Sequence, residues 1–232
     1  MFSNSMKKVL FSFTTLLALI SLVAAGCSDD NDTSSASSTD KPSIVVTTNI
    51  LGDVVTNMVG DSFNVEVIMP PGSDPHDFQA SAQQVQSMME ADLLVVNGAN
   101  FEEGMLDVIA SAKSDGVMVF EAISVVSQLE GSDDHSDHGG HDDHDDHEGH
   151  DHGGIDPHFF TDPGRMAVVV EELSEFLVAN FPNASQGFVS SASDYAQDLV
   201  DLDAEVKEIL SEIPDEGKVL VTNHAVLSLI HI

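Results

Sequence analysis

The sequence predicts an α/β fold in which two lobes with mainly parallel sheets are joined by a long rigid helix. The first observation behind this prediction is that short aliphatic runs alternate with segments of helical spacing between residues 44 and 120, a pattern typical of βαβ units. The second is a continuous apolar stripe between residues 188 and 213, long enough for a helix that connects two lobes. Roughly 190 residues follow the polar segment near the start, which suffices for one large domain or two lobes.

In the first half of the chain, strands and helices are expected to alternate. Residues 44–48 form a β-branched run typical of a buried strand, and helical spacing follows directly. The second strand is stopped by Pro70, Pro71 and Gly72. The expected strands are 44–48, 65–69, 92–97 and 117–120, and the expected helices are 50–60, 81–90 and 101–111.

Two helices and one strand are expected in the second half. Asp162 is placed as the N-cap of a helix that has Pro163 at its first position and ends near residue 181. In the longer helix that follows, apolar residues from 188 to 213 step by four and three, which we interpret as a face packed on a core. Residues 218–222 then predict another strand.

The first residues have the features of an export signal. Lys7 and Lys8 precede an apolar run over residues 9–25, which is short for a membrane span. Small residues then lead to Cys27, the single cysteine of the chain. This pattern resembles a bacterial lipoprotein cleavage box, which implies that Cys27 is lipidated; the alternative is a lone thiol at an ordinary cleavage site. The polar residues after it are expected to form a disordered tether.

The chain is strongly acidic. It contains 40 Asp and Glu residues against 7 Lys and Arg, for a formal net charge of -33. Such a field repels nucleic acid and anionic lipid surfaces and concentrates cations, so a nucleic-acid partner is excluded. A high negative charge is also a common adaptation for solubility in salty surroundings, so it supports a cation ligand only in part.

An Asp-Pro-His triplet occurs twice, at His76 and at His158. Proline fixes its own φ and restricts the residue before it, so the histidine leaves the backbone in a restricted direction. The aspartate of each triplet is a candidate acceptor for one ring nitrogen, which would direct the other nitrogen to a metal. A single triplet is more often a solvated turn. Two copies around a histidine-rich tract favour a metal site.

That tract spans residues 131–154 and consists of His, Asp, Gly and Ser with a single Glu. We expect a surface loop that captures Zn²⁺ or another borderline metal with low affinity, because imidazoles beside carboxylates suit such ions. The alternative is a merely solvated acidic insertion. No strand is followed by a glycine-rich phosphate loop, so nucleotide binding is not expected. The candidate auxiliary ligands are His135, His138, His141, His144, His147, His150 and His152.

These motifs resemble the substrate-binding lipoproteins of bacterial metal-ion ABC importers, the zinc and manganese group. The resemblance covers residues 44–225. It is carried by Pro-Gly-Ser-Asp-Pro-His-Asp-Phe, the histidine-rich loop, Asp-Pro-His-Phe-Phe-Thr-Asp-Pro and Thr-Asn-His, in this order behind the cleavage box. It implies two α/β lobes joined by a rigid helix, with the metal held between them.

The resemblance also implies a set of ligands. By position, His76, His158 and His224 correspond to metal ligands of the family, and the fourth, usually a carboxylate in the second lobe, is expected beyond Ile232. Manganese-type relatives generally place a carboxylate where His224 stands. Three imidazoles therefore favour Zn²⁺ over Mn²⁺, because the tetrahedral preference of Zn²⁺ accepts three nitrogens and one oxygen.

The expected domain organisation follows from these segments. Residues 227–232 resemble the translation of a transposase sequencing adaptor, so we expect an artefactual tail and a second lobe that is mostly missing. The expected divisions are a lipoprotein signal peptide at 1–26, a tether at 27–42, an N-terminal α/β lobe at 43–182, a linker helix at 183–213 and the start of a C-terminal lobe at 214–232.

The predicted function is an extracytoplasmic zinc-binding component of a metal ABC importer, monomeric and anchored by lipid at the cell surface or in the periplasm. It would capture the ion between its lobes and deliver it to the permease. One alternative is a metal-storage or adhesion lipoprotein of the surface. Another is a zinc hydrolase, which the absence of a His-Glu-x-x-His pair argues against. An enzyme is therefore not expected.

Overall fold

The computed structural model describes residues 41–129, 154–214 and 217. The predictions made for Cys27, for the histidine-rich tract and for His224 lie outside these residues. Among the helices that are described, none is long and apolar enough to cross a membrane.

The described part of the chain is built on a four-stranded sheet whose strands are all parallel, as predicted. The order in the sheet is β2-β1-β3-β4. In the register, Ile44 of β1 is paired with Val65 on one side and with Leu93 on the other. The strands are β1 (Ser43–Val46), β2 (Asn64–Val67), β3 (Leu93–Val96) and β4 (Met118–Glu121).

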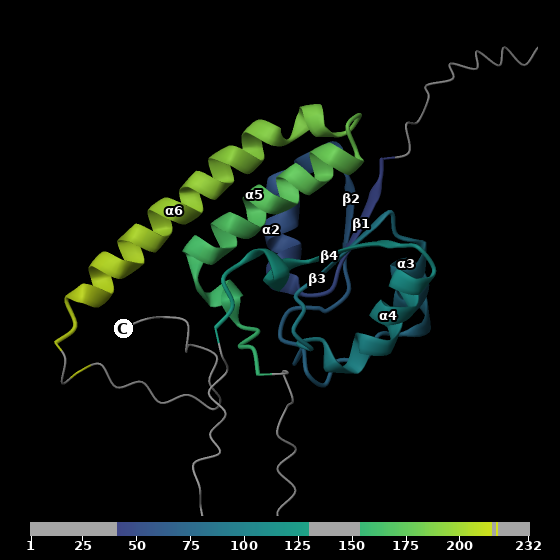
Figure 1. Cartoon of the computed structure of the whole chain (residues 1–232), viewed down its shortest axis with the longest axis horizontal. Helices are drawn as coiled ribbons and strands as arrows, with labels where there is room; N and C mark the ends of the chain where they lie inside the picture. The colour runs from purple at the N-terminus through teal and green to yellow at the C-terminus, as the bar shows by residue number, and fades with distance from the viewer. Residues whose placement is uncertain (1–40, 130–153, 215–216, 218–232) are drawn as a thin grey trace, which may run out of the picture. The chain divides into compact units, whose positions relative to one another are not determined.

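Helices cover both faces of the sheet (Figure 1). One face carries α2 (Asn49–Val59), α5 (Pro163–Asn180) and α6 (Val189–Ser211), and the other carries α3 (Ala82–Glu90) and α4 (Leu106–Ser114). Short 3₁₀ turns complete the elements: η1 (Gly60–Ser62), η2 (Glu103–Met105), η3 (Ala122–Val125), η4 (Phe159–Thr161) and η5 (Ser185–Gly187).

Two apolar clusters hold these layers together, one on each face of the sheet. Because successive strand residues point to opposite faces, Ile44 and Val46 contact the cluster of α2, α5 and α6, whereas Val45 between them contacts the cluster of α3 and α4. All four residues of β3 are buried. Each such side chain stabilises the fold by roughly 1.5–3 kcal/mol relative to an exposed position.

The order of the strands places a topological switch point between β1 and β3. The chain leaves β1 through α2 to reach β2 on one side, and returns through α3 to reach β3 on the other side. In open α/β sheets, ligands bind outside the carboxyl ends of the strands at such a point. Here these ends are Thr47 and Asn97, both fully buried.

Side chains cap the starts of α2, α3 and α5. Thr48 caps α2, and Ser81 and Gln84 form a capping box at the start of α3. The Oδ1 of Asp162 accepts the backbone N–H of Arg165 at 3.1 Å, and Pro163 opens α5 as expected. The start of α5, which follows the loop of His158, is therefore fixed by its own sequence.

The interpretation of the long helix as packed on a core is correct only for its first half. Phe188, Ala192 and Ala196 are buried against α2 and α5. Further along, Leu202 is 44% exposed and Ile209 is 57% exposed. The apolar stripe therefore continues beyond the elements that cover it in the described part of the chain.

A backbone bond closes the connection between β4 and the second triplet. The N–H of Asp156 donates to the carbonyl of Leu129 at 3.0 Å. Leu129 and Asp156, which flank the segment between these two parts of the described chain, are thus held next to each other.

Candidate metal centre

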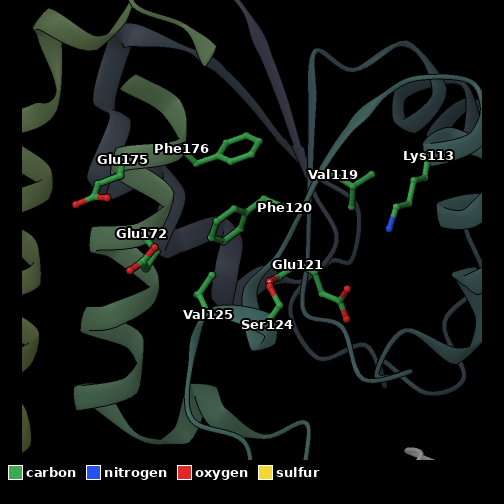
Figure 2. A pocket seen from close by; sticks show the side chains of 9 residues that line it. All are labelled: Lys113, Val119, Phe120, Glu121, Ser124, Val125, Glu172, Glu175 and Phe176. Atoms are coloured by element: carbon green, nitrogen blue, oxygen red, sulfur yellow. The ribbon is translucent and has the colours of Figure 1, made fainter. Parts of the chain in front are cut away.

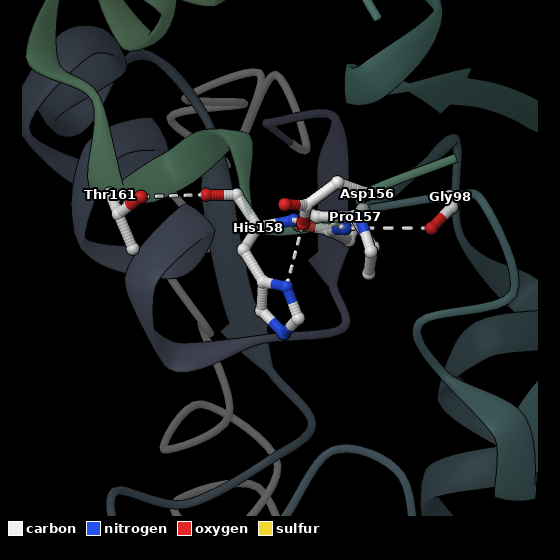
Figure 3. A network of polar contacts seen from close by, with 6 residues as sticks. Gly98, Asp156, Pro157, His158 and Thr161 are labelled. Atoms are coloured by element: carbon white, nitrogen blue, oxygen red, sulfur yellow. Dashed lines mark hydrogen bonds and ion pairs between the residues drawn. The ribbon is translucent and has the colours of Figure 1, made fainter. Parts of the chain in front are cut away.

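His158 is held by its own triplet and by the turn that follows it (Figure 3). The Oδ1 of Asp156 accepts the backbone N–H of His158 at 3.0 Å and lies 2.8 Å from its ring Nδ1. Its carbonyl accepts the hydroxyl of Thr161 at 2.9 Å. The side chain is almost fully buried. With Nδ1 facing a carboxylate, this imidazole is arranged to bind a metal through Nε2.

His76 is held differently. Its triplet contributes only a backbone bond, from the N–H of His76 to the Oδ1 of Asp74 at 3.0 Å. The ring Nδ1 instead lies 3.2 Å from the Oε1 of Glu103, a residue of η2. The expectation that the aspartate of each triplet contacts its own ring is thus met at His158, whereas at His76 a carboxylate from another segment stands beside the ring.

The structure brings the two histidines together from loops 82 positions apart in the chain. Their ring centroids are 6.3 Å apart. Because Zn–N bonds measure about 2.0–2.1 Å, an ion at Nε2 lies about 3 Å from a ring centroid, and two rings on one ion are at most roughly 6.5 Å apart. The observed spacing lies within this limit, and a tetrahedral angle would draw the rings about 1 Å closer.

Phe101 packs against both rings. Its centroid lies 5.2 Å from that of His76 and 5.6 Å from that of His158, with near-perpendicular planes. Phe160 is a second aromatic neighbour of His158, with 5.9 Å between the two ring centroids. Such an edge-to-face arrangement limits ring rotation and excludes water from one side of the pair.

Phe101 reaches this position through a left-handed turn after β3. Gly98, Ala99 and Asn100 have φ values of 90°, 50° and 56°. Alanine and asparagine adopt positive φ only at a cost, so such turns concentrate at functional sites. The predicted helix at 101–111 is therefore wrong at its start: residues 98–102 are irregular, and α4 begins only at Leu106.

Glu102 lies directly beneath this turn and is almost fully buried. Burial raises the pKa of its carboxyl group, while the hydrogen bonds from Thr47, Asn97 and Gly98 act in the opposite direction and favour the charged form. A carboxylate at such a depth is uncommon unless its oxygens are satisfied by donors.

Gly104 lets η2 approach the loop of His76. A Cβ at this position would lie 2.3 Å from the backbone oxygen of Phe78. Only glycine permits this contact, which brings Glu103 beside His76. The loops after β2 and β3 are thus joined by close backbone packing as well as by side chains.

A cavity of about 520 Å³ lies elsewhere, beside the edge strand β4 (Figure 2). It is bordered by Glu121 of that strand, by Glu172 and Glu175 of α5, and by Lys113 of α4. Neither His76 nor His158 lines it. The histidine pair is therefore the stronger candidate for metal chemistry.

Among the residues that the structure describes, no group of three or more metal-ligating side chains is assembled. Of the three ligands predicted from the resemblance, His76 and His158 are brought together, and His224 lies outside the described residues. The same holds for the auxiliary histidines of the tract and for Cys27.

Several residues of the site were missed at the level of sequence. Asn97, Phe101, Glu102 and Glu103 all follow β3, at the same sheet edge as the loop of His76. The available signal was a polar Asn-Gly pair directly after a fully apolar strand. The spacing of the residues after it also fits a helix, which hides their role.

Two imidazoles that approach each other at the switch point of a parallel sheet, each with a carboxylate beside Nδ1, are an arrangement expected of a metal-binding protein of the α/β class. The family model described as zinc-uptake complex component A, periplasmic (ZnuA), matches residues 44–230. The chain belongs to this family of metal ABC transporter substrate-binding proteins, whose members are solute-binding proteins and not enzymes.

Individual relatives agree with this assignment. The chain is 30% identical over 216 residues to the manganese-binding lipoprotein MntA of Halalkalibacterium halodurans, and 28% identical over 226 residues to the manganese ABC transporter substrate-binding lipoprotein scaA of Streptococcus gordonii. These matches cover 93% and 94% of the chain but 64% and 66% of the relatives. The chain thus spans just under two thirds of their length.

A solved structure shows the same fold. The periplasmic zinc-binding protein TroA from Treponema pallidum superposes with a TM-score of 0.67 at 26% identity, over 81% of this chain and 61% of that one. The structural neighbours are two-lobe binding proteins, and the described residues correspond to one lobe. The α/β prediction is confirmed.

Proposed function

We propose that this chain is the metal-capturing part of an ABC importer, that Zn²⁺ is its cargo and that His76, His158 and His224 are its protein ligands. The observation that carries the proposal is the approach of His76 and His158, with ring centroids 6.3 Å apart. Each ring has a carboxylate beside Nδ1, an arrangement that directs Nε2 to the ion.

Zinc is preferred over manganese because of the donor set. Neutral imidazole suits Zn²⁺, whereas Mn²⁺ favours carboxylate and water oxygens. The names of the relatives include both metals, so the choice rests on the histidine at position 224 and on the two rings already in place. Lipidation at Cys27 would keep the protein outside the membrane beside its permease, to which the ion is delivered.

The auxiliary histidines are proposed to raise the local supply of metal. The described residues on either side of their tract, Leu129 and Asp156, are joined by a backbone hydrogen bond next to the loop of His158. Ions held weakly there are released within reach of the tight site. Uptake by the permease, and not storage or adhesion, is then the fate of the metal.

The proposal is tested by calorimetric titration of the metal-free chain with Zn²⁺ and with Mn²⁺. Structural zinc sites bind Zn²⁺ with a free energy of about 10–16 kcal/mol. One of four ligands therefore contributes about 3 kcal/mol, which corresponds to roughly 100-fold in affinity. His76→Ala and His158→Ala should each weaken zinc binding by about this factor. Affinity should also fall in acid, because protons compete for imidazole nitrogens.

Deletion of residues 133–152 is the matched control. It removes seven histidines but none of the three proposed tight ligands, so the tight phase of the titration should persist and only weak binding should be lost. Unchanged zinc affinity in His158→Ala would overturn the site. Tighter binding of Mn²⁺ than of Zn²⁺ would overturn the choice of metal.

A further inference from the structure

The buried carboxylate of Glu102 joins the ends of the two central strands. Its Oε1 accepts the hydroxyl of Thr47, which follows β1, at 2.6 Å and the backbone N–H of Asn97, which follows β3, at 2.6 Å. Its Oε2 accepts the backbone N–H of Gly98 at 3.2 Å. Three donors from two strand ends therefore converge on one side chain, at the switch point of the sheet.

Asn97 extends this connection to the loop of His158. Its Nδ2 donates to the carbonyl of Pro157 at 3.0 Å, and its side chain is fully buried. Figure 3 shows this part of the loop, with Pro157 between Asp156 and His158. The carbonyl of Pro157 belongs to the peptide plane that directly precedes His158. An unbroken path of hydrogen bonds thus runs from Glu102 to the backbone of the proposed ligand.

Glu102 also secures the segment that reaches both rings. The bond from Gly98 fixes the first residue of the left-handed turn, whose φ values are all positive. Backbone in this region persists only where surrounding contacts hold it. The turn delivers Phe101, which packs on His76 and His158, and Glu103, which faces His76.

We propose that Glu102 is a positioning residue of the metal centre: it holds the turn at residues 98–100 and, through Asn97, the peptide of His158, so that both imidazoles face one ion. This inference rests on the proposed function, because it assigns the histidines as ligands. Glu102 itself touches neither ring and is not proposed as a ligand.

A carboxylate is specifically suited to this place. Both of its oxygens accept hydrogen bonds, so three donors are satisfied at once. Glutamine has the same shape but presents an NH₂ group at one of the two positions, which would face a donor. Glu102→Gln therefore breaks the arrangement with little change in volume. Thr47→Val removes one of the three donors with almost no change in side-chain shape. The hydrogen bonds of the Thr47 hydroxyl go to Glu102 and to the carbonyl of Val95, not to the loop of His158.

The matched control is Glu121→Gln. Glu121 also accepts a backbone N–H of this turn, from Ala99 at 3.3 Å, but it is exposed and lies outside the path to Asn97. A general effect of removing an acidic side chain near the turn would appear in this variant as well. A positioning effect would not.

Two measurements on the full chain test the proposal. In the metal-free protein, two-bond ¹H–¹⁵N correlations of the imidazole report which ring nitrogen of His158 carries the proton. Zinc affinity is then measured by competition with a chelator. The unaltered chain should show one predominant tautomer of His158, with the proton on the nitrogen that faces Asp156; in Glu102→Gln this should become a mixture, and affinity should fall about 10- to 100-fold, the range seen when partners behind metal ligands are removed. Thr47→Val should show a smaller change in the same direction, and Glu121→Gln none.

The outcomes separate this inference from the proposed function. If Glu102→Gln unfolds, Thr47→Val decides: an unchanged tautomer with unchanged affinity overturns the positioning role. The role is also overturned if Glu102→Gln lowers only the thermal midpoint. If the unaltered chain binds no zinc, the proposed function fails, and the imidazole signals alone then support or overturn the positioning of His158.

Discussion

At the scale of single residues, the two Asp-Pro-His triplets share a sequence but differ in what their aspartates do. Asp156 is buried and contacts both the backbone and the ring of its histidine. Asp74 is exposed and contacts only the backbone. The motif predicts the direction of the histidine, because proline restricts the local backbone. It does not predict the partner of the ring, which at His76 comes from η2.

This difference makes a prediction for alanine variants of the two aspartates. Asp156→Ala should lower zinc affinity about 10- to 100-fold, because the ring loses the carboxylate that orients it. Asp74→Ala should lower zinc affinity by a several-fold smaller factor, because Glu103 still faces the ring of His76. Isothermal titration of both variants provides the comparison, each serving as control for the other. Equal losses in the two would contradict the assigned roles.

At the scale of elements, the strands and most helices were predictable because their apolar periods are regular. The strands β1 to β4 fall within one or two residues of the expected ranges, and Asp162 with Pro163 marked the start of α5. The segment between β3 and α4 was not predictable. Its conformation depends on the buried carboxylate of Glu102 and on contacts with loops remote in the chain. Neither produces a periodic pattern of apolar residues in the local sequence.

The close approach of η2 to the loop of His76 gives a prediction at this scale. Gly104→Ala places a Cβ within 2.3 Å of the backbone oxygen of Phe78, so one of the two segments must move. Overpacking of this kind typically costs about 1–3 kcal/mol. Glu103 should then separate from His76, and zinc affinity should fall together with the free energy of unfolding.

Gly217→Ala is the control for this substitution. A Cβ there meets the side chain of Ile213 at 3.4 Å, an ordinary contact. Its denaturation midpoint and its zinc affinity should match those of the unaltered chain. If Gly104→Ala behaves like Gly217→Ala in both measurements, the close packing of the two loops does not position His76.

At the scale of the whole molecule, the alternation of segments predicted the class of fold and composition gave the sign of the charge, but neither predicted the order of the strands. Alternating strands and helices require a parallel sheet, yet several orders satisfy that requirement. The order β2-β1-β3-β4 places the switch point between β1 and β3, and this is what brings the loops of His76 and His158 to one edge. The histidines and Asp156 could be named from sequence, whereas Phe101, Glu102 and Glu103 could not.

The net charge of -33 gives a prediction for the stability of the metal-free chain. Repulsion between like charges destabilises the compact state, and raising the salt from 0.01 M to 1 M shortens the screening length from about 30 Å to about 3 Å. Sodium chloride should therefore raise the melting temperature. A gain of about 1 kcal/mol corresponds to roughly 2–4 °C for a chain of this size.

The variant that lacks residues 133–152 is again the control, because it removes nine of the 40 acidic residues. Its melting temperature, followed by circular dichroism, should respond less to salt than that of the unaltered chain. A melting temperature that stays constant or falls with added salt would show that charge repulsion does not limit stability.

The bond between Asp156 and Leu129 bears on how this protein can change over evolutionary time. Because Leu129 and Asp156 are joined, the entropy cost of closing the connection between them grows only with the logarithm of the number of residues in it. Doubling that number costs about 0.6 kcal/mol. Changes in the number of histidine repeats between these two positions should therefore cost the fold little free energy.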